Sequence, residues 1–259
     1  MLTVMKFGGS SVADLEHIRN VANRCIAKQR EGSQVVVVLS AMGKTTDNLI
    51  ATAKQITEQP SRRELDMLLT TGEQVSVSLM AMTLISMGVS AVSLNAWQVP
   101  MHTTSNYQNA RFKRIDSERI RKELDANKIV IVTGFQGVNK YDDITTLGRG
   151  GSDTSAVALA AALNAERCDI YTDVEGVYTT DPRIVPKATR LAPFRAYPPS
   201  PPLFARKSVA PSRTPRERPN VSEASTILAS ISTCRTATSK LDSNNRTSSS
   251  LPGVSVTNN

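Results

Sequence analysis

The sequence contains few of the residues on which several common protein classes depend. Among 259 residues there are three cysteines, two histidines and one tryptophan. Cys25, Cys168 and Cys234 are odd in number, widely spaced and without a C-x-x-C pair, so neither a disulfide framework nor a cysteine-based zinc site is predicted. We expect reduced, buried thiols in a cytoplasmic protein. Because His17 and His102 are the only histidines, catalysis through histidine is not favoured.

Long hydrophobic runs are also missing. Lys6 and the glycines that follow it interrupt the first apolar segment. No stretch approaches the roughly 18 to 20 consecutive apolar residues of a membrane span. We therefore expect no signal peptide and no membrane partner, while the apolar content of 40% is sufficient for a folded core.

The net charge of +8 is not spread evenly along the chain. Residues 192–259 hold nine Lys and Arg but three Asp and Glu, so the first 191 residues are nearly balanced. The basic segment has few aromatic residues and no known nucleic-acid-binding module. We therefore expect no nucleic-acid partner.

Strands and helices alternate along the first 191 residues. This alternation predicts an α/β fold with a mostly parallel central sheet. Apolar runs predict strands at Leu2–Phe7, Gln34–Leu39, Ala91–Leu94, Ile129–Thr133 and Asp169–Thr172. Helical spacing of apolar residues predicts helices at Ala13–Arg30, Thr46–Gln59, Gly72–Met87 and Ser152–Leu163.

The chain changes character near Leu191. Residues 192–259 are rich in Pro, Ser, Thr and Arg, and seven prolines fall between Pro198 and Pro219. Proline removes backbone donors from helices and sheets, and such a composition buries little apolar area. We expect a disordered tail that does not pack on the preceding domain. Two origins stay open, a natural linker and an out-of-frame coding sequence.

The stretch TLGRGGSDTSAVALAAAL (Thr146 to Leu163) has the features of an anion site. Glycines allow close approach of the backbone to a ligand, and the N-terminus of the following helix carries unpaired N–H groups and partial positive charge. Arg149 adds a planar fork that suits a carboxylate or a phosphate. The alternative is an ordinary loop with a glycine-rich helix cap.

A second such arrangement opens the chain. The first predicted strand ends at Gly8-Gly9-Ser10-Ser11, and a helix follows for which Asp14 is the expected N-cap. Strand, Gly-Gly turn and helix commonly place phosphate near backbone amides. Lys6 would direct its ammonium at that turn, although a solvated lysine at a strand end is an equally good interpretation.

Two familiar nucleotide motifs are excluded. A Walker A loop would end at Gly43-Lys44-Thr45, but Val38 occupies the place of its first glycine. The dinucleotide fingerprint would begin at Gly148-x-Gly150, but Asp153 occupies the place of its third glycine.

Five blocks of the sequence, taken in order, resemble those of the aspartokinases of the amino-acid kinase family. They are VMKFGGSSV (Val4 to Val12), TTGEQVS (Thr70 to Ser76), GFQG (Gly134 to Gly137), the glycine-rich stretch from Thr146 to Leu163, and YTDVEGVYTTDPR (Tyr171 to Arg183). The resemblance covers residues 1–191. It implies a three-layer sandwich with a mostly parallel central sheet.

The resemblance also implies roles for individual residues. Lys6 and Asp153 would be catalytic, with Asp153 orienting Lys6. ATP would be bound by Lys6, Phe7, Gly8, Gly9, Ser10, Thr172, Asp173, Tyr178 and Arg183. L-Aspartate would be bound by Thr46, Glu73, Arg149, Gly150, Gly151 and Ser152, with Glu73 on the α-ammonium and Arg149 on a carboxylate. Mg²⁺ would accompany ATP, and no residue is assigned as a metal ligand.

The implied reaction is phosphoryl transfer from ATP to the side-chain carboxylate of L-aspartate, which gives 4-phospho-L-aspartate for lysine, threonine and methionine synthesis. This carboxylate has a pKa near 3.9 and is ionised at neutral pH, so no general base is required. Phosphoryl transfer then depends on positioning and on cancelling negative charge.

The tail departs from the family. It contains no Gly-Ala-Lys segment, no further family strand and no regulatory ACT domain. The resemblance therefore implies an incomplete catalytic domain at residues 1–191, of a kind that forms homo-oligomers when intact. The alternative function is that of an inactive nucleotide-binding protein or a partner subunit of an aspartokinase.

Overall fold

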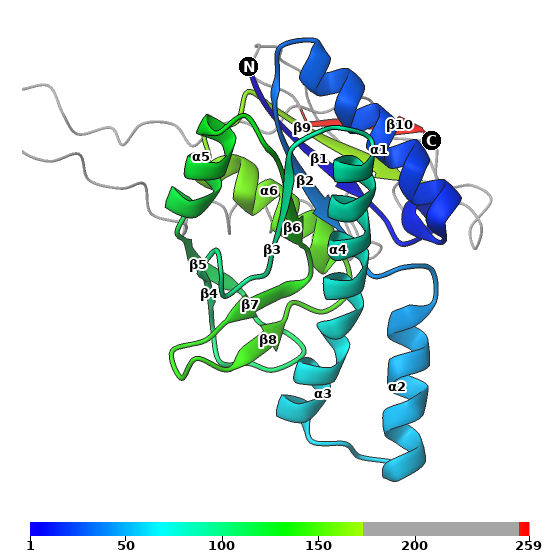
Figure 1. Cartoon of the computed structure of the whole chain (residues 1–259). Helices are drawn as coiled ribbons and strands as arrows, with labels where there is room; N and C mark the ends of the chain where they lie inside the picture. The colour runs from blue at the N-terminus through cyan, green and yellow to red at the C-terminus, as the bar shows by residue number, and fades with distance from the viewer. Residues whose placement is uncertain (173–253, 259) are drawn as a thin grey trace, which may run out of the picture.

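The computed structural model describes residues 1–172 and 254–258, and its centre is a six-stranded sheet (Figure 1). The strand order is β10-β9-β1-β2-β6-β3, and every adjacent pair is parallel. The strands are β1 (Leu2–Phe7), β2 (Gln34–Leu39), β3 (Ala91–Leu94), β6 (Ile129–Thr133), β9 (Arg167–Thr172) and β10 (Val254–Asn258). The predicted α/β class and parallel sheet are confirmed.

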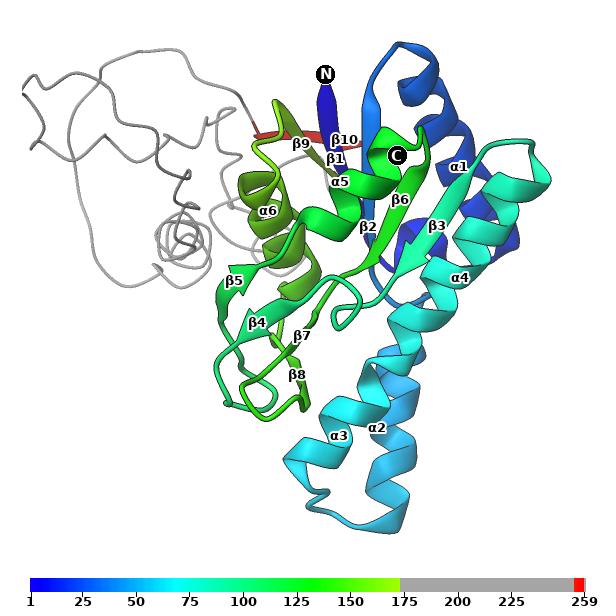
Figure 2. The same cartoon turned by 60° about the vertical axis from the view of Figure 1, so that its left-hand side comes forward.

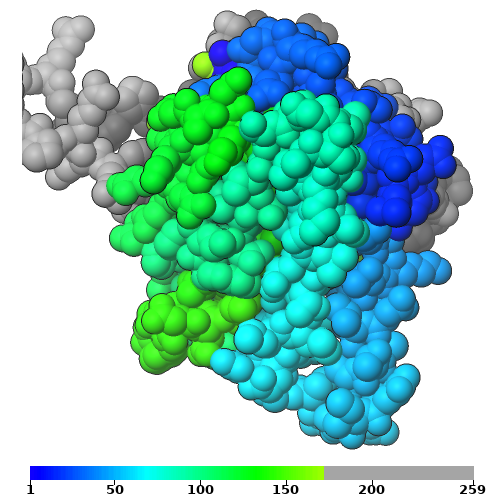
Figure 3. All heavy atoms as spheres, viewed as in Figure 1, coloured from blue at the N-terminus to red at the C-terminus, as the bar shows by residue number. Residues whose placement is uncertain are grey.

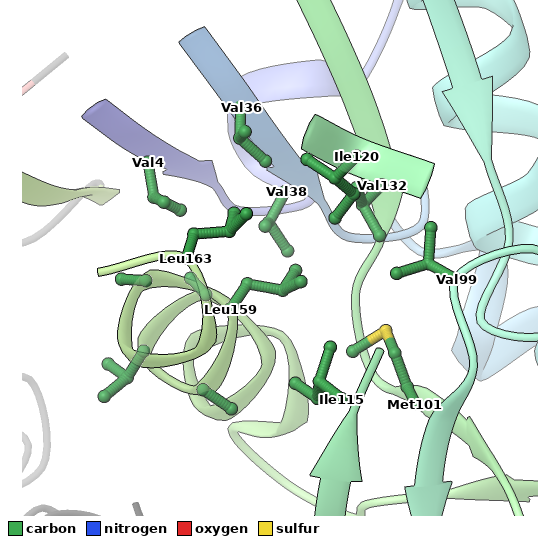
Figure 4. Close-up of a cluster of buried hydrophobic side chains, with 14 of the residues drawn as sticks. Val4, Val36, Val38, Val99, Met101, Ile115, Ile120, Val132, Leu159 and Leu163 are labelled. Atoms are coloured by element: carbon green, nitrogen blue, oxygen red, sulfur yellow. The ribbon is translucent and has the colours of Figure 1, made fainter. Parts of the chain in front are cut away.

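Helices cover both faces of this sheet. One face packs against α1 (Leu15–Arg30) and α4 (Thr71–Ser86), and the other packs against α5 (Glu118–Asp125) and α6 (Gly151–Ala162). Figure 4 shows the second face, where Val36 and Val38 of β2 lie near Leu159 of α6. Because successive side chains of a strand point to opposite faces, Val35 and Val37 belong to the other apolar cluster. The predicted three-layer sandwich is therefore confirmed.

The first helix begins at a side-chain cap. The Asp14 carboxylate accepts a hydrogen bond from the His17 backbone N–H at 2.9 Å, as expected of an N-cap. A short 3₁₀ turn, η1 (Ser10–Val12), precedes it, so α1 begins at Leu15 rather than at Ala13. The turn keeps the chain close to the end of β1 before the helix starts.

A second, smaller sheet was not predicted from the sequence pattern. Its strand order is β5-β4-β7-β8, and it lies beside α3, below the large sheet in the orientation of Figure 2. Its strands are β4 (Met101–Thr103), β5 (Phe112–Ile115), β7 (Gln136–Val138) and β8 (Ile144–Thr146). Strands of three or four residues are too short to show a clear alternation of apolar and polar residues.

Two further helices extend from the large sheet. They are α2 (Thr45–Ile56) and α3 (Arg62–Leu69), and Figure 3 shows them in light blue and cyan at the lower end of the molecule. The predicted helix Thr46–Gln59 corresponds to α2 and ends earlier than expected. Neither α3 nor α5 was predicted.

One helical segment among the described residues, Arg62–Ser86, is long and apolar enough to cross a membrane by length and composition alone. Its mean hydropathy is 1.3 over the most apolar window, half of which is buried inside the molecule. A core helix of a soluble protein also meets these criteria. Met80 and Leu84 of this segment are fully buried against the sheet, which is the usual environment of such a helix.

The prediction that the tail does not pack on the preceding domain is wrong for residues 254–258. These residues form β10, which pairs with β9 in parallel register from Val254 opposite Cys168 to Asn258 opposite Thr172. The physical reason is that β9 offers a free sheet edge on the side away from β1, and the sequence VSVTN is rich in β-branched residues that favour strands. The expected disorder of residues 192–253 concerns positions outside the described residues.

Candidate functional site

Three parallel strands bring their carboxyl ends to one edge of the large sheet. The loops that leave β1, β2 and β6 are tied together by backbone hydrogen bonds there. Ser40 N–H donates to Phe7 C=O at 3.3 Å, Gly134 N–H donates to Leu39 C=O at 2.9 Å, and Gly43 N–H donates to Gly9 C=O at 3.0 Å. In open α/β sheets, ligands bind outside the carboxyl ends of the strands. This edge is therefore the candidate site.

An ion pair joins the two segments in which the sequence predicts anion sites. Lys6 Nζ on β1 lies 2.7 Å from Asp153 Oδ1 in the first turn of α6. Lys6 is 8% exposed, so its interpretation as a solvated lysine at a strand end is wrong. A buried ammonium requires a partner of opposite charge, and Asp153 supplies it. The pair places one cation at the strand ends with its position fixed.

The glycine-rich turn lets the start of α6 pack closely against the end of β6. Gly148 and Gly150 have φ of +77° and +73°, which residues with a side chain rarely adopt. A Cβ on Gly134 would lie 2.7 Å from the Cβ of Ser152, so only glycine permits this close approach. Ser155 Oγ accepts a hydrogen bond from Phe135 N–H at 3.0 Å. The N-terminus of α6 is thereby fixed beside Lys6 and Asp153.

Glu73 contributes a buried carboxylate at the start of α4. Its Oε1 accepts a hydrogen bond from Ala41 N–H at 2.9 Å, while its buried Oε2 has no hydrogen-bond donor among the described residues. Burial is the main cause that raises the pKa of Glu73 to about 7. A buried carboxylate oxygen without a donor is costly, and a cationic ligand would remove that cost.

The remaining residues predicted to bind aspartate lie around these groups. Thr46 is a partly buried residue in the first turn of α2, which follows directly on the loop that donates to Glu73. Gly150, Gly151 and Ser152 begin α6. The Arg149 side chain is exposed in the same turn, so it is free to reach a ligand.

The residues predicted to contact ATP are placed in part. Gly8 and Gly9 follow β1 directly, and Ser10 begins η1. A Cβ on Gly9 would lie 2.7 Å from Ala41 C=O, so the turn requires glycine there. The Phe7 side chain is fully buried and stacks on Tyr171 at a centroid distance of 4.4 Å, which leaves only its backbone for a ligand. Thr172 ends β9, whereas Asp173, Tyr178 and Arg183 lie outside the described residues.

The sequence pattern did not reveal the backbone and hydroxyl groups that complete the edge. The Ala41 amide holds Glu73, and the Thr133 hydroxyl at the end of β6 is buried without a hydrogen-bond partner among the described residues. The sequence signal for these two groups is their position, since Ala41 follows a buried apolar strand and Thr133 ends one. That signal is weak because every strand of the sheet ends in some loop.

Mg²⁺, which the family resemblance implies, has no ready-made cage in the described part of the chain. No three His, Cys, Asp or Glu side chains in residues 1–172 or 254–258 gather so that they could hold a metal ion. Mg²⁺ usually retains several waters and is held by substrate phosphates with one or two carboxylates. We assign no protein ligand to this ion.

The first three quarters of the chain are similar to known proteins. The model of the amino acid kinase family matches residues 1–196. An aspartokinase of Bacillus sp. (strain MGA3) is 59% identical over 191 residues, which are 74% of this chain and 46% of that protein. The chain spans about half the length of the curated relatives it matches.

Solved structures show the same architecture. The crystal structure of aspartate kinase from Synechocystis is similar with a TM-score of 0.63 and 49% identity, over 73% of this chain and 31% of that one. The structure of E. coli aspartokinase III in complex with aspartate and ADP has a TM-score of 0.65 and 29% identity, over 74% of this chain and 53% of that one.

Proposed function

The chain belongs to the amino acid kinase family, and on that premise we propose that it transfers the γ-phosphoryl group of ATP to the side-chain carboxylate of L-aspartate. The product would be 4-phospho-L-aspartate, an acyl phosphate that feeds lysine, threonine and methionine synthesis. The similarity to E. coli aspartokinase III, whose structure contains aspartate and ADP, supports this choice of substrates.

The observation that carries the proposal is the ion pair between Lys6 and Asp153. It fixes an ammonium at 2.7 Å from its carboxylate partner, where the ends of β1 and the start of α6 meet. Phosphoryl transfer is catalysed mainly by positioning and by cancelling the charge of the transferred group. Lys6 would therefore stabilise the negative charge of the phosphoryl group during its transfer, and Asp153 would orient Lys6.

The reaction needs no proton transfer to the protein. One oxygen of the substrate carboxylate attacks the γ-phosphorus, the bond from that phosphorus to the β–γ bridging oxygen breaks, and ADP leaves with the electron pair. The attacking carboxylate is ionised near neutral pH. This agrees with a site assembled from Lys6, Asp153 and Glu73 rather than from histidine.

Groups around Lys6 would hold the amino acid. The buried Oε2 of Glu73, which has no donor among the described residues, would accept from the α-ammonium. The exposed Arg149 would hold a carboxylate with its planar fork. Thr46 and the first residues of α6, Gly150, Gly151 and Ser152, would complete the pocket through hydroxyl and backbone N–H groups.

The turn after β1 would hold the nucleotide. Backbone groups of Phe7, Gly8, Gly9 and Ser10 would contact the phosphates, and Mg²⁺ bound to them would neutralise part of their charge. Thr172, Asp173, Tyr178 and Arg183 would line the rest of the nucleotide pocket, as the family resemblance implies. We also propose a cytoplasmic location, assembly into a homo-oligomer, and no nucleic-acid or membrane partner.

The test is aspartate-dependent turnover of the purified chain. ADP release is measured in a coupled assay, and the acyl phosphate is trapped with hydroxylamine, with L-glutamate as the matched control substrate. Aspartate-dependent ADP release together with hydroxamate formation would support the proposal. ATP binding without turnover would instead support an inactive nucleotide-binding protein or partner subunit.

A further inference from the structure

Asp66 is a buried acid with no part in the mechanism above. It lies on α3 with 0% exposure. The inference that follows rests on the proposed function, because it assigns Asp66 a purpose with respect to Arg149.

The Asp66 carboxylate accepts hydrogen bonds from three donors, which lie on the small sheet and in the loop between β4 and β5. Oδ2 accepts from Thr146 N–H at 2.9 Å and from Gln108 N–H at 3.0 Å. Oδ1 accepts from the Thr146 hydroxyl at 2.8 Å. These bonds tie α3 to the last residue of β8, which is 80 positions away along the chain.

Both segments that Asp66 holds border the turn that carries Arg149. Thr146 is three residues before Arg149, and its C=O accepts from Ala110 N–H at 2.9 Å. Gln108 lies against the turn itself, because a Cβ on Gly148 would be 3.0 Å from the Gln108 C=O. One carboxylate therefore fixes the entry to the turn and the loop on which the turn rests.

A second carboxylate lies at the other end of β8, in the hairpin that β8 forms with β7, and it is bound in a different way. Asp143, just before β8, accepts from the Tyr107 hydroxyl at 2.8 Å and from Arg63 of α3 at 3.2 Å. Within the described part of the chain, its carboxylate binds only side chains, and the residue is partly exposed. Asp66 instead binds two backbone N–H groups in a buried position. Removing it would leave those buried donors unsatisfied, which typically costs more than losing an exposed ion pair.

We propose that Asp66 is a positioning residue that holds the turn from Thr146 to Gly151, and with it the Arg149 guanidinium, in the place from which it contacts the substrate carboxylate. A displacement of about 1 Å at such a group, caused by a change far from the chemistry, can lower turnover by as much as about a hundredfold.

The experiment compares four variants of the full chain. Asp66→Ala removes both acceptor oxygens and with them all three hydrogen bonds. Asp66→Asn is the conservative rescue, because its amide oxygen can accept from both backbone N–H groups while its NH₂ donates to the Thr146 hydroxyl. Thr146→Val removes only the hydroxyl bond and serves if Asp66→Ala does not fold. Asp143→Ala is the matched control at the far end of the hairpin.

The first readout is amide hydrogen exchange. In Asp66→Ala, we expect the amides from Thr146 to Gly151 to exchange about tenfold faster than in the wild type, as expected of lost buried hydrogen bonds. Asp66→Asn should restore slow exchange, and Thr146→Val should show a smaller increase. Asp143→Ala should leave these amides unchanged. Unchanged exchange in both Asp66→Ala and Thr146→Val would overturn the proposal, whether or not the chain phosphorylates aspartate.

The second readout is the KM for each substrate. Asp66→Ala should raise KM for L-aspartate by about tenfold or more with little change in KM for ATP, and it should add no further increase in an Arg149→Ala background. Equal increases for both substrates, or an additive effect with Arg149→Ala, would reduce Asp66 to a general structural residue and overturn the proposal. Absence of aspartate turnover in the wild type would instead contradict the proposed function, while the exchange readout still decides the role of Asp66 in the turn.

Discussion

The two sheets are held in the molecule by different kinds of interaction. The large sheet is covered on both faces by apolar clusters, in which residues such as Val4, Val36 and Val132 are fully buried. The small sheet contributes Met101 and Phe112 to one of these clusters, but hydrogen bonds connect it to α3. The stabilisation from apolar burial depends on the buried area and little on the position of each atom. A hydrogen bond, in contrast, requires a particular donor and acceptor at a defined distance and angle. The two sheets should therefore respond differently to substitution.

The largest effect on stability is expected from a cavity beside the large sheet. Leu159 of α6 is fully buried against β2 (Figure 4). Leu159→Ala should lower the free energy of unfolding by about 2 to 5 kcal/mol, measured by urea denaturation. Leu15→Ala is the control, because Leu15 is 59% exposed, and it should change stability far less. Similar losses at both positions would contradict the assignment of the core.

The next largest effect concerns catalysis at the edge of the large sheet. Lys6→Ala removes the cation that Asp153 orients, and it should lower kcat by about a hundred- to a thousandfold while weakening ATP binding much less. Lys28→Ala, which breaks an ion pair with the exposed Glu31, should leave kcat unchanged. A near-normal kcat in Lys6→Ala would show that Lys6 does not stabilise the transferred group.

A pH-dependent effect is expected from Glu73. Its pKa is raised from the ordinary 4.5 to about 7, so between these values the folded state binds a proton that the unfolded state has released. The contribution of Glu73 to stability is therefore fully present below pH 4.5 and is lost as the pH rises to 7, by about 3 kcal/mol at most. Glu73→Gln should abolish this fall and be more stable than the wild type at pH 8. The free energy of unfolding of both proteins is measured at several pH values. The same pH dependence in the wild type and in Glu73→Gln would contradict this prediction.

The smallest effect is expected where backbone packing meets the small sheet. A Cβ on Gly137 would lie 2.3 Å from Thr103 Cγ2 and 2.7 Å from Met101 C=O. Gly137→Ala should therefore cost about 1 to 3 kcal/mol of stability, because the backbone of β4 cannot move aside easily. Gly8→Ala is the control, since among the described residues its Cβ would meet only Lys6 Nζ, at 3.6 Å. A thermal melt that shifts equally for both variants would contradict this account of the small sheet.

The sequence alone predicted the large sheet better than the small one. Runs such as Gln34–Leu39 and Ile129–Thr133 coincide with β2 and β6, because strands buried on both faces are continuously apolar. The strands of the small sheet escaped prediction because they are three or four residues long. The tail was also misjudged: the few residues of β10 find a partner in the edge of β9, and composition averaged over residues 192–259 does not show this.

Some features of the site follow from the sequence by itself. The positive φ of Gly148 and Gly150, the cap at Asp14 and the Gly-Gly turn after β1 are local properties of the chain, because each depends on a residue and its near neighbours. The tertiary structure alone decided which distant groups meet. Lys6 reaches Asp153, Ala41 holds Glu73 and Asp66 reaches Thr146. The reason is that the strand order β9-β1-β2-β6 and the packing of α3 against the small sheet set these distances, and neither can be read from local periodicity.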